Sequence, residues 1–190
     1  MSKGDPAEGV LAVSTMSRRL ASLEDQCETL ANFYVAVQRL YMAAGRDDVL
    51  SAIVEIVANL VGSEEIAIFE TGEDSLTLTL ANGVAAEPLR RIPSNTGLIG
   101  WVLRSGEMLL PEARSLPSMP PSEPYEHSLT ACVPLLVRGR VPGAVAIFKL
   151  LPQKPRLSTL DHGLFEVLQS HAGLALYVAN ALAHGPGGAS

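Results

Sequence analysis

The sequence feature that most constrains the fold is the stretch from Ser128 to Leu151, where two long apolar runs meet at the short basic turn Arg138-Gly139-Arg140. Both runs are rich in Val, Ile, Leu and Ala, and most of these residue types favour buried strands. Gly139 can adopt the positive φ that a tight connection between antiparallel strands requires. The stretch therefore predicts a central β-hairpin, relative to which the remainder of the chain can be placed.

The composition indicates a packed protein and argues against several function classes. Hydrophobic residues make up 47% of the 190 residues and charged residues 18%, which suits one domain with a sizeable core. The formal net charge of -6 argues against nucleic-acid binding, because that affinity depends on clustered Lys and Arg. No apolar run approaches the ~18 residues of a membrane helix, and the N-terminus lacks the apolar segment of a signal peptide. We therefore expect a cytoplasmic protein without membrane insertion.

The N-terminal region is predicted to form a flexible tail over residues 1–14 and a long helix over residues 15–45. In this helix apolar residues recur in alternating steps of four and three, the pattern of a coiled-coil seam. They are Met16, Leu20, Leu23, Cys27, Leu30, Tyr34, Val37 and Tyr41. Such a narrow stripe usually contacts another helix, either in a second copy of the chain or in its own domain.

The middle of the chain predicts short elements separated by turns. A helix over residues 49–61, with Asp47 or Asp48 as its N-cap, is followed by strands over 66–70 and 75–81. A marginal strand is expected within residues 88–93.

A second group of elements leads to the hairpin. Asn95 or Thr96 can cap a short helix over residues 98–103, and a strand is expected over 108–110. The proline-rich segment from Pro111 to Tyr125 cannot form regular structure, and such long loops often cover binding sites. We expect this loop to roof any pocket.

A second long helix is predicted over residues 158–183, opened by a capping box from Ser158 to Asp161 and followed by a flexible tail over 185–190. It carries its own seam, so the simplest arrangement is a helical bundle across a twofold axis. The predicted homodimer interface comprises Leu20, Leu23, Cys27, Leu30, Tyr34, Leu164, Val167, His171, Leu174 and Val178. The region from 46 to 184 is expected to form one domain.

Several fragments, in order along the chain, resemble the GAF domain family. They are Ile92-Pro93, the run from Gly97 to Glu107, Ser128 with Val133-Pro134-Leu135, Gly139 and Gly143, and Leu157-Ser158 to Asp161 with Leu164-Phe165. The likeness covers roughly residues 46 to 182. It implies an α+β fold: an antiparallel sheet with terminal helices packed on one face and a loop-roofed small-molecule pocket on the other. It also implies parallel dimerisation through the terminal helices.

The pleat of the hairpin assigns its side chains to two faces. Leu129, Ala131, Val133 and Leu135 are expected to pack against helices, and the opposite face is expected to line the pocket. The predicted pocket residues are Phe69, Trp101, Leu116, Met119, Tyr125, Thr130, Cys132, Ala146 and Phe148. This lining is largely apolar and uncharged, which suits a greasy ligand, a partner side chain or a filled interior.

The sequence lacks the residues that the known chemistries of the family require. A free-methionine-sulfoxide reductase would need cysteines near Leu98 and Ile99 and carboxylates where Thr130, Ala146 and Phe148 stand. No Asn-Lys pair for a cyclic nucleotide is present, and Cys132 has no adjacent histidine for a covalently attached bilin. The histidines lack metal-site spacing, and Cys27 and Cys132 suggest buried free thiols. We expect no catalytic residue, no metal and no cofactor.

Three functions remain open from the sequence. The first is a non-enzymatic, homodimeric regulatory module of the GAF type that binds a small apolar ligand or a partner protein in signalling. The second is a protein-docking scaffold with a vestigial pocket, favoured because no output region follows the domain before Ser190. The third is a thiol-dependent reductase that uses Cys132, which the missing second thiol and acids disfavour.

Overall fold

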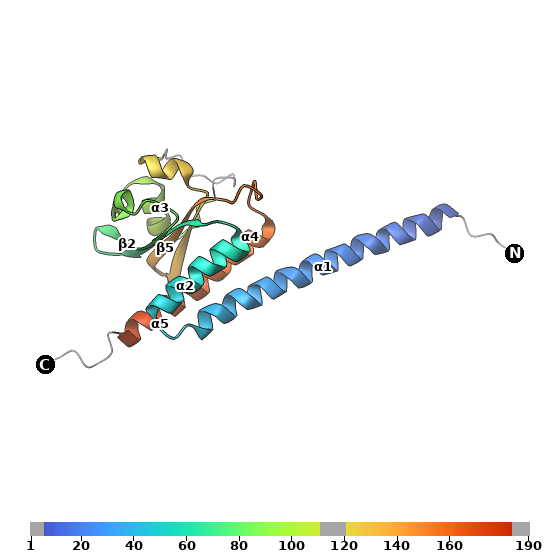
Figure 1. Cartoon of the computed structure of the whole chain (residues 1–190), viewed down its shortest axis with the longest axis horizontal. Helices are drawn as coiled ribbons and strands as arrows, with labels where there is room; N and C mark the ends of the chain where they lie inside the picture. Colours follow the sequence, from blue (N-terminus) through green and yellow to red (C-terminus); the bar gives the residue numbers. More distant parts are fainter. Residues whose placement is uncertain (1–5, 111–120, 184–190) are drawn as a thin grey trace.

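The computed structural model describes residues 6–110 and 121–183, and it contains a five-stranded antiparallel sheet in the order β3-β2-β1-β5-β4. The strands are β1 (Glu65–Thr71), β2 (Ser75–Asn82), β3 (Arg91–Pro93), β4 (Ala131–Val137) and β5 (Arg140–Lys149). Helices cover both faces of this sheet (Figure 1). The predicted α+β class is confirmed.

The predicted hairpin is confirmed as β4 and β5, which pair from Ala131 opposite Ile147 to Val137 opposite Arg140. Its turn has only two residues, Arg138 with φ 50° and Gly139 with φ 77°. Turns of this mirror-image kind match the right-handed twist of the strands they join. The hairpin is central in packing although β4 is an edge strand, because β5 lies between β4 and β1.

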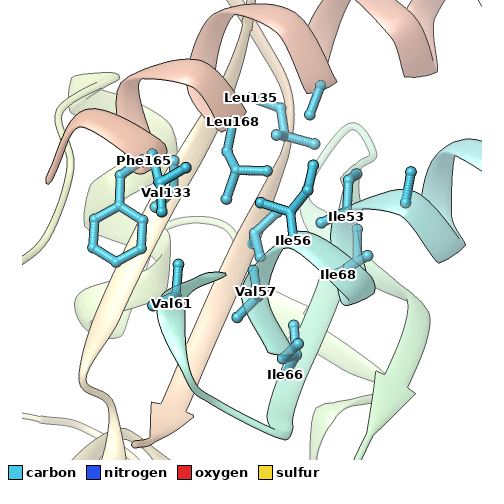
Figure 2. Close-up of a cluster of buried hydrophobic side chains, with 14 of the residues drawn as sticks. Ile53, Ile56, Val57, Val61, Ile66, Ile68, Val133, Leu135, Phe165 and Leu168 are labelled. Atoms are coloured by element: carbon cyan, nitrogen blue, oxygen red, sulfur yellow. The ribbon is translucent and has the colours of Figure 1, made fainter. Parts of the chain in front are cut away.

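One face of the sheet is covered by α2 (Arg46–Ile56), α4 (Thr159–Val167) and α5 (Gly173–Ala183). A π-helical turn over Val57–Val61 extends α2, and another over Leu168–Ala172 joins α4 to α5. A cluster of apolar side chains from both layers forms the core between these helices and the sheet (Figure 2). Figure 2 labels ten of these residues: Ile53, Ile56, Val57, Val61, Ile66, Ile68, Val133, Leu135, Phe165 and Leu168.

Two of the helix ends predicted from the sequence are confirmed. The capping box at Ser158 and Asp161 is present, and Asp161 is also bonded to Lys154 at 2.5 Å. Gly62 ends the α2 segment in the left-handed conformation, as expected. The expected N-cap was wrong, because Gly45 holds that position and Asp47 and Asp48 lie in the first turn. Their negative charges in the first turn still interact favourably with the helix dipole.

Helix α1 (Pro6–Met42) begins well before the expected residue 15 and therefore extends into residues that were expected to form a tail. Proline fits the first helical position, and Ala7, Leu11 and Ala12 are good helix formers, so local propensity favours the extension. The last turns of α1 pack on the domain through Phe33, Ala36 and Leu40. The preceding part projects beyond the domain (Figure 1).

Helix α3 (Gly97–Ser105) covers the opposite face of the sheet and forms a second core with it. Leu129 belongs to this second core, so its expected place on the face of α2, α4 and α5 was wrong. The reason is that β4 begins only at Ala131, and the pleat does not extend to Leu129. The predicted strand over 108–110 is reduced to a single bridge between Leu109 and Cys132.

Both edges of the sheet are poor templates for an added strand. On β4, Leu109 occupies the backbone groups of Cys132, Pro134 has no N–H to offer, and Gly173 lies against the peptide of Leu136. The opposite edge, β3, has only three residues and ends at Pro93. Association through strand addition is therefore disfavoured.

The contact between α5 and β4 depends on a glycine. A Cβ atom at Gly173 would lie 2.8 Å from both the backbone N and O of Leu136, and backbone atoms cannot move aside cheaply. We expect Gly173→Ala to lower the free energy of unfolding by about 1–3 kcal/mol in urea denaturation. Gly45→Ala is the control, because a Cβ there meets no atom within 4 Å. Equal stability of the two variants would contradict this close packing.

Candidate functional site

The face of the sheet that was expected to line a pocket is filled by α3. Phe69, Cys132 and Ala146 from three strands pack with Ile99 and Val102 of α3, and all five are 0% exposed. A solvent-accessible space beside any of them would leave part of its surface exposed. The interior between α3 and this part of the sheet is therefore packed with the protein's own side chains.

The predicted pocket residues consequently separate into groups. Phe69, Cys132 and Ala146 belong to the filled interior, and Trp101 is half-buried against it from α3. Tyr125, Thr130 and Phe148 line hollows at the edge of the same face. Leu116 and Met119 lie outside the described residues, as does most of the loop expected to roof the pocket.

Two hollows adjoin at Ser128 and Phe148. One, of about 260 Å³, reaches from these residues to Tyr125, Val84 and Leu89. The other, of about 360 Å³, extends past Thr130 toward Lys154. The Thr130 hydroxyl does not face a ligand as a free donor, because it donates to the carbonyl of Phe148 at 2.5 Å. That hydroxyl is therefore occupied, and the hollows are lined by polar groups, among them Glu65, Lys149 and Lys154, as well as by apolar side chains.

The Tyr125 phenol at this edge is neutral over the ordinary pH range. Burial and the charges of Glu126 and Glu123 raise the pKa of Tyr125 to about 12. The phenol loses its proton at about pH 10 in the unfolded chain but only at about pH 12 in the folded chain. Tyr125 therefore lowers the free energy of unfolding only as pH rises from about 10 toward about 12. Tyr125 is therefore a hydrogen-bond donor or packing group here and not a base.

A buried carboxylate that the sequence did not single out lies beside these hollows. Glu126, in a 3₁₀ helix over Pro124–Ser128, is 2% exposed and accepts the backbone N–H groups of Leu98 at 2.7 Å and Ile99 at 3.2 Å through Oε1. Its Oε2 accepts the backbone N–H of Ser122 at 2.8 Å and the Ser122 hydroxyl at 3.2 Å. Glu126 thus caps α3 from a distant segment.

The local sequence explains why this cap is needed. Thr96 is the N-cap residue of α3, but its side chain makes no capping hydrogen bond. Gly97 has φ 68°, and a Cβ atom there would lie 2.4 Å from the Glu126 carboxylate. The glycine leaves room for the acid, and the acid satisfies the amide groups at the start of the helix. The assignment of Asn95 or Thr96 as side-chain cap was therefore wrong.

Cys132 has the properties of a structural thiol. It is fully buried in the second core, and burial, with a contribution from the Glu126 charge, raises the pKa of Cys132 far above its ordinary value. The thiolate is the nucleophile in thiol chemistry, so Cys132 is held in its unreactive form. Cys27, the other cysteine, is exposed on α1, and the expectation that both thiols are buried was wrong for Cys27.

We expect iodoacetamide to modify Cys27 and leave Cys132 unmodified in the folded protein, at a dilution where the chain is a monomer. Cys27 should react because its side chain is exposed, and Cys132 should not react because its thiol is buried and protonated. Mass spectrometry of the alkylated protein distinguishes one adduct from two, and the urea-unfolded protein, in which both thiols react, is the control. Rapid modification of Cys132 in the native state would contradict its place in the packed core.

The described residues hold no cluster of three metal-binding side chains, and no helix among them is both long and apolar enough to cross a membrane. His171, predicted for the dimer interface, makes an edge-to-face contact with Tyr41 at a ring distance of 6.0 Å. This contact links α1 to the turn before α5.

The exposed large apolar side chains of the described residues all lie on α1 and α5. The α1 residues Met16, Leu20, Leu23, Leu30, Tyr34 and Tyr41 are all more than half exposed, although they form one stripe of the helix. Leu174, Val178 and Leu182 continue this surface on α5 and, with Tyr41 and His171, line an apolar groove of about 170 Å³. We call the α1 stripe from Met16 to Tyr41 the seam.

Two predicted interface residues do not lie on this surface as expected. Leu164 is 0% exposed in the first core, where it supports the sheet, so its assignment to a dimer interface was wrong. Val167 is only half-exposed and packs against the same core. A seam pattern alone cannot distinguish a helix face turned inward from one turned outward.

The comparisons with known proteins agree with this architecture. A family model described as GAF domain matches residues 43–176. The GAF domain of a phosphoenolpyruvate-protein phosphotransferase from Acinetobacter is 19% identical with a TM-score of 0.64, covering 83% of this chain and 98% of that chain. The corresponding domain from Coxiella burnetii is 17% identical with a TM-score of 0.65, covering 82% and 96%.

An enzyme with this fold is also similar. The free methionine-R-sulfoxide reductase from Neisseria meningitidis, solved with its substrate, is 19% identical with a TM-score of 0.53, covering 80% of this chain and 93% of that chain. At these identities the structures establish the shared fold alone. No curated protein matches the chain in sequence.

Proposed function

This chain belongs to the GAF domain family, whose members are commonly regulatory or sensory, and we propose that it is a non-enzymatic regulatory module that acts as a homodimer through its helices. Some proteins of this fold are enzymes, so the assignment depends on this chain's own residues. The observation that carries the proposal is the contrast between two regions of the molecule. The interior between α3 and the sheet is packed, whereas the seam on α1 is an exposed apolar stripe.

The exposed seam supports pairing with a second copy of the chain. Leu20, Leu23 and Leu30 are 58%, 57% and 66% exposed, and stripes of large apolar residues in water mark interaction surfaces. Their spacing is that of coiled-coil core positions, which are satisfied when the same stripe of a partner helix interlocks with them. The adjoining groove at Tyr41 and Leu174 would lie beside the same twofold axis.

Charges beside the seam favour a parallel pair in register. If Leu20, Cys27 and Tyr34 are the a positions, Arg19 is a g position and Glu24 is the following e position. In a parallel dimer these two positions of opposite helices lie next to each other and form an ion pair on each side. The same register sets the two Cys27 residues opposite each other across the axis.

The reductase function has no support in the residues. Cys132 is buried with a raised pKa, and Cys27 is on the far-projecting helix. The strand positions of the expected acids are Thr130, Ala146 and Phe148, of which Ala146 is fully buried. Thiol chemistry needs an accessible thiolate and a second group to resolve it, and this site offers neither.

A small apolar ligand is the second candidate, supported by the hollow beside Tyr125, Val84 and Phe148. Native mass spectrometry of protein purified from its own cells separates the two. A dimer without added mass is the expected result, and a stoichiometric small molecule on each subunit would favour the ligand-binding function. A monomer with no ligand would contradict both.

A further inference from the structure

The tip of the β4–β5 hairpin carries a backbone conformation that its sequence does not favour. Arg138 has φ 50° and is the one non-glycine residue with positive φ in residues 6–110 and 121–183. Two-residue turns of this kind strongly prefer Asn-Gly or Asp-Gly, because those residues tolerate the left-handed region. Arginine at this position is therefore a local cost to folding, and strain of this sort is concentrated at functional positions.

Arg138 borders a large surface hollow. A space of about 580 Å³ lies between the hairpin tip and α5, and it is lined by Val137, Arg138, Arg140, Val141, Pro142 and Tyr177. Thr71 also borders it, but its hydroxyl donates to the carbonyl of Val141. The lining thus combines apolar side chains with two guanidinium groups.

Both arginines are free to bind an anion. Neither Arg138 nor Arg140 forms an ion pair with any described residue, whereas Arg39, Arg46 and Arg90 pair with Glu55, Glu70 and Glu87. The chain as a whole has a net charge of -6, so a positive site stands out against its background. A guanidinium is a planar fork of donors that fits a carboxylate with two parallel hydrogen bonds.

We propose that this hairpin hollow docks an acidic segment of a partner protein, one that carries carboxylates for the two arginines and apolar side chains for Val141, Pro142 and Tyr177. The proposal rests on the proposed function in that it names the kind of partner the module recognises. The hollow shares no residue with the seam, so a dimer can present two such sites.

The test uses a variant that should fold better than the natural protein. Arg138→Asn creates the preferred Asn-Gly turn and is expected to raise the melting temperature. It is also expected to weaken binding of a fluorescein-labelled peptide, Glu-Leu-Glu-Glu-Leu-Glu, about tenfold in fluorescence anisotropy at low salt. Arg140→Thr should weaken binding similarly, and Arg90→Asn, at a paired arginine outside the hollow, should not.

The outcomes separate this proposal from the dimer. Equal binding by all variants, or no binding by the natural protein, would overturn the acidic docking site. Competition by inorganic phosphate as effective as that by unlabelled peptide would also overturn it, because the hollow would then be a site for free anions. Sedimentation of Arg138→Asn as a dimer is expected throughout, and a monomeric natural protein would overturn only the proposed homodimer.

Discussion

Replacing Leu23 and Leu30 together by glutamate is expected to convert the protein from a dimer to a monomer in sedimentation velocity. Both side chains are more than half exposed in one subunit, so the substitutions leave the fold of the single chain intact. In the paired seam each glutamate would face its counterpart and lose water, at a cost of about 3 kcal/mol or more for each unpaired buried charge. The dimer should therefore dissociate over the accessible concentration range.

The matched control adds the same charge beside the seam. Ala21 and Ser22 are also exposed on α1 but lie outside the stripe, so Ala21→Glu with Ser22→Glu should remain dimeric. If the seam variant sediments like the natural protein, the stripe does not hold the subunits together. The same substitutions should leave the urea-induced unfolding of the full-length monomer unchanged when it is measured below the dimer's dissociation constant.

Removal of the Glu126 carboxylate is expected to have the largest effect on stability. Glu126→Ala leaves the amide groups of Leu98, Ile99 and Ser122 without their buried acceptor, and we expect a loss of about 3–5 kcal/mol in the free energy of unfolding. Glu126→Gln keeps the shape but places amide hydrogens near these donors, so a loss of about 2 kcal/mol is expected.

Urea denaturation of both variants measures this effect. Glu123→Gln is the control, because that neighbouring acid is exposed, and its stability should stay within about 0.5 kcal/mol of the natural protein. If Glu126→Ala were equally mild, the carboxylate would not be the cap on which α3 depends. Since α3 fills the sheet's second face, its loss would also expose the interior that is packed in the natural chain.

The hairpin, the start of α4 and the end of the α2 segment could be predicted because their signals are local. The two apolar runs that meet at Gly139, the capping box at Ser158 and the left-handed glycine at Gly62 each depend on neighbouring residues. The Glu126 cap could not be predicted in this way, because it acts on amide groups about thirty residues earlier along the chain. Only the folded arrangement brings the two segments together.

The sequence predicted which residue types line the candidate site, but it did not predict whether the site is hollow or filled. The sequence indicated an apolar, uncharged face around Cys132 and Ala146, and this holds. Whether such a face is hollow or filled depends on how closely α3 approaches, which no single-strand pattern encodes. Seam patterns have the same ambiguity, and for that reason Leu164 and Leu23 were indistinguishable although one is buried and the other exposed.

Oxidative cross-linking of Cys27 tests the paired seam most directly. In a parallel, in-register dimer the two Cys27 thiols lie across the axis at a core position, whereas Cys132 is buried and out of reach. Mild oxidation is expected to give a disulfide-linked dimer that persists in Cys132→Ser and disappears in Cys27→Ser. A protein that stays monomeric on a non-reducing gel after oxidation would contradict pairing of the helices along this seam.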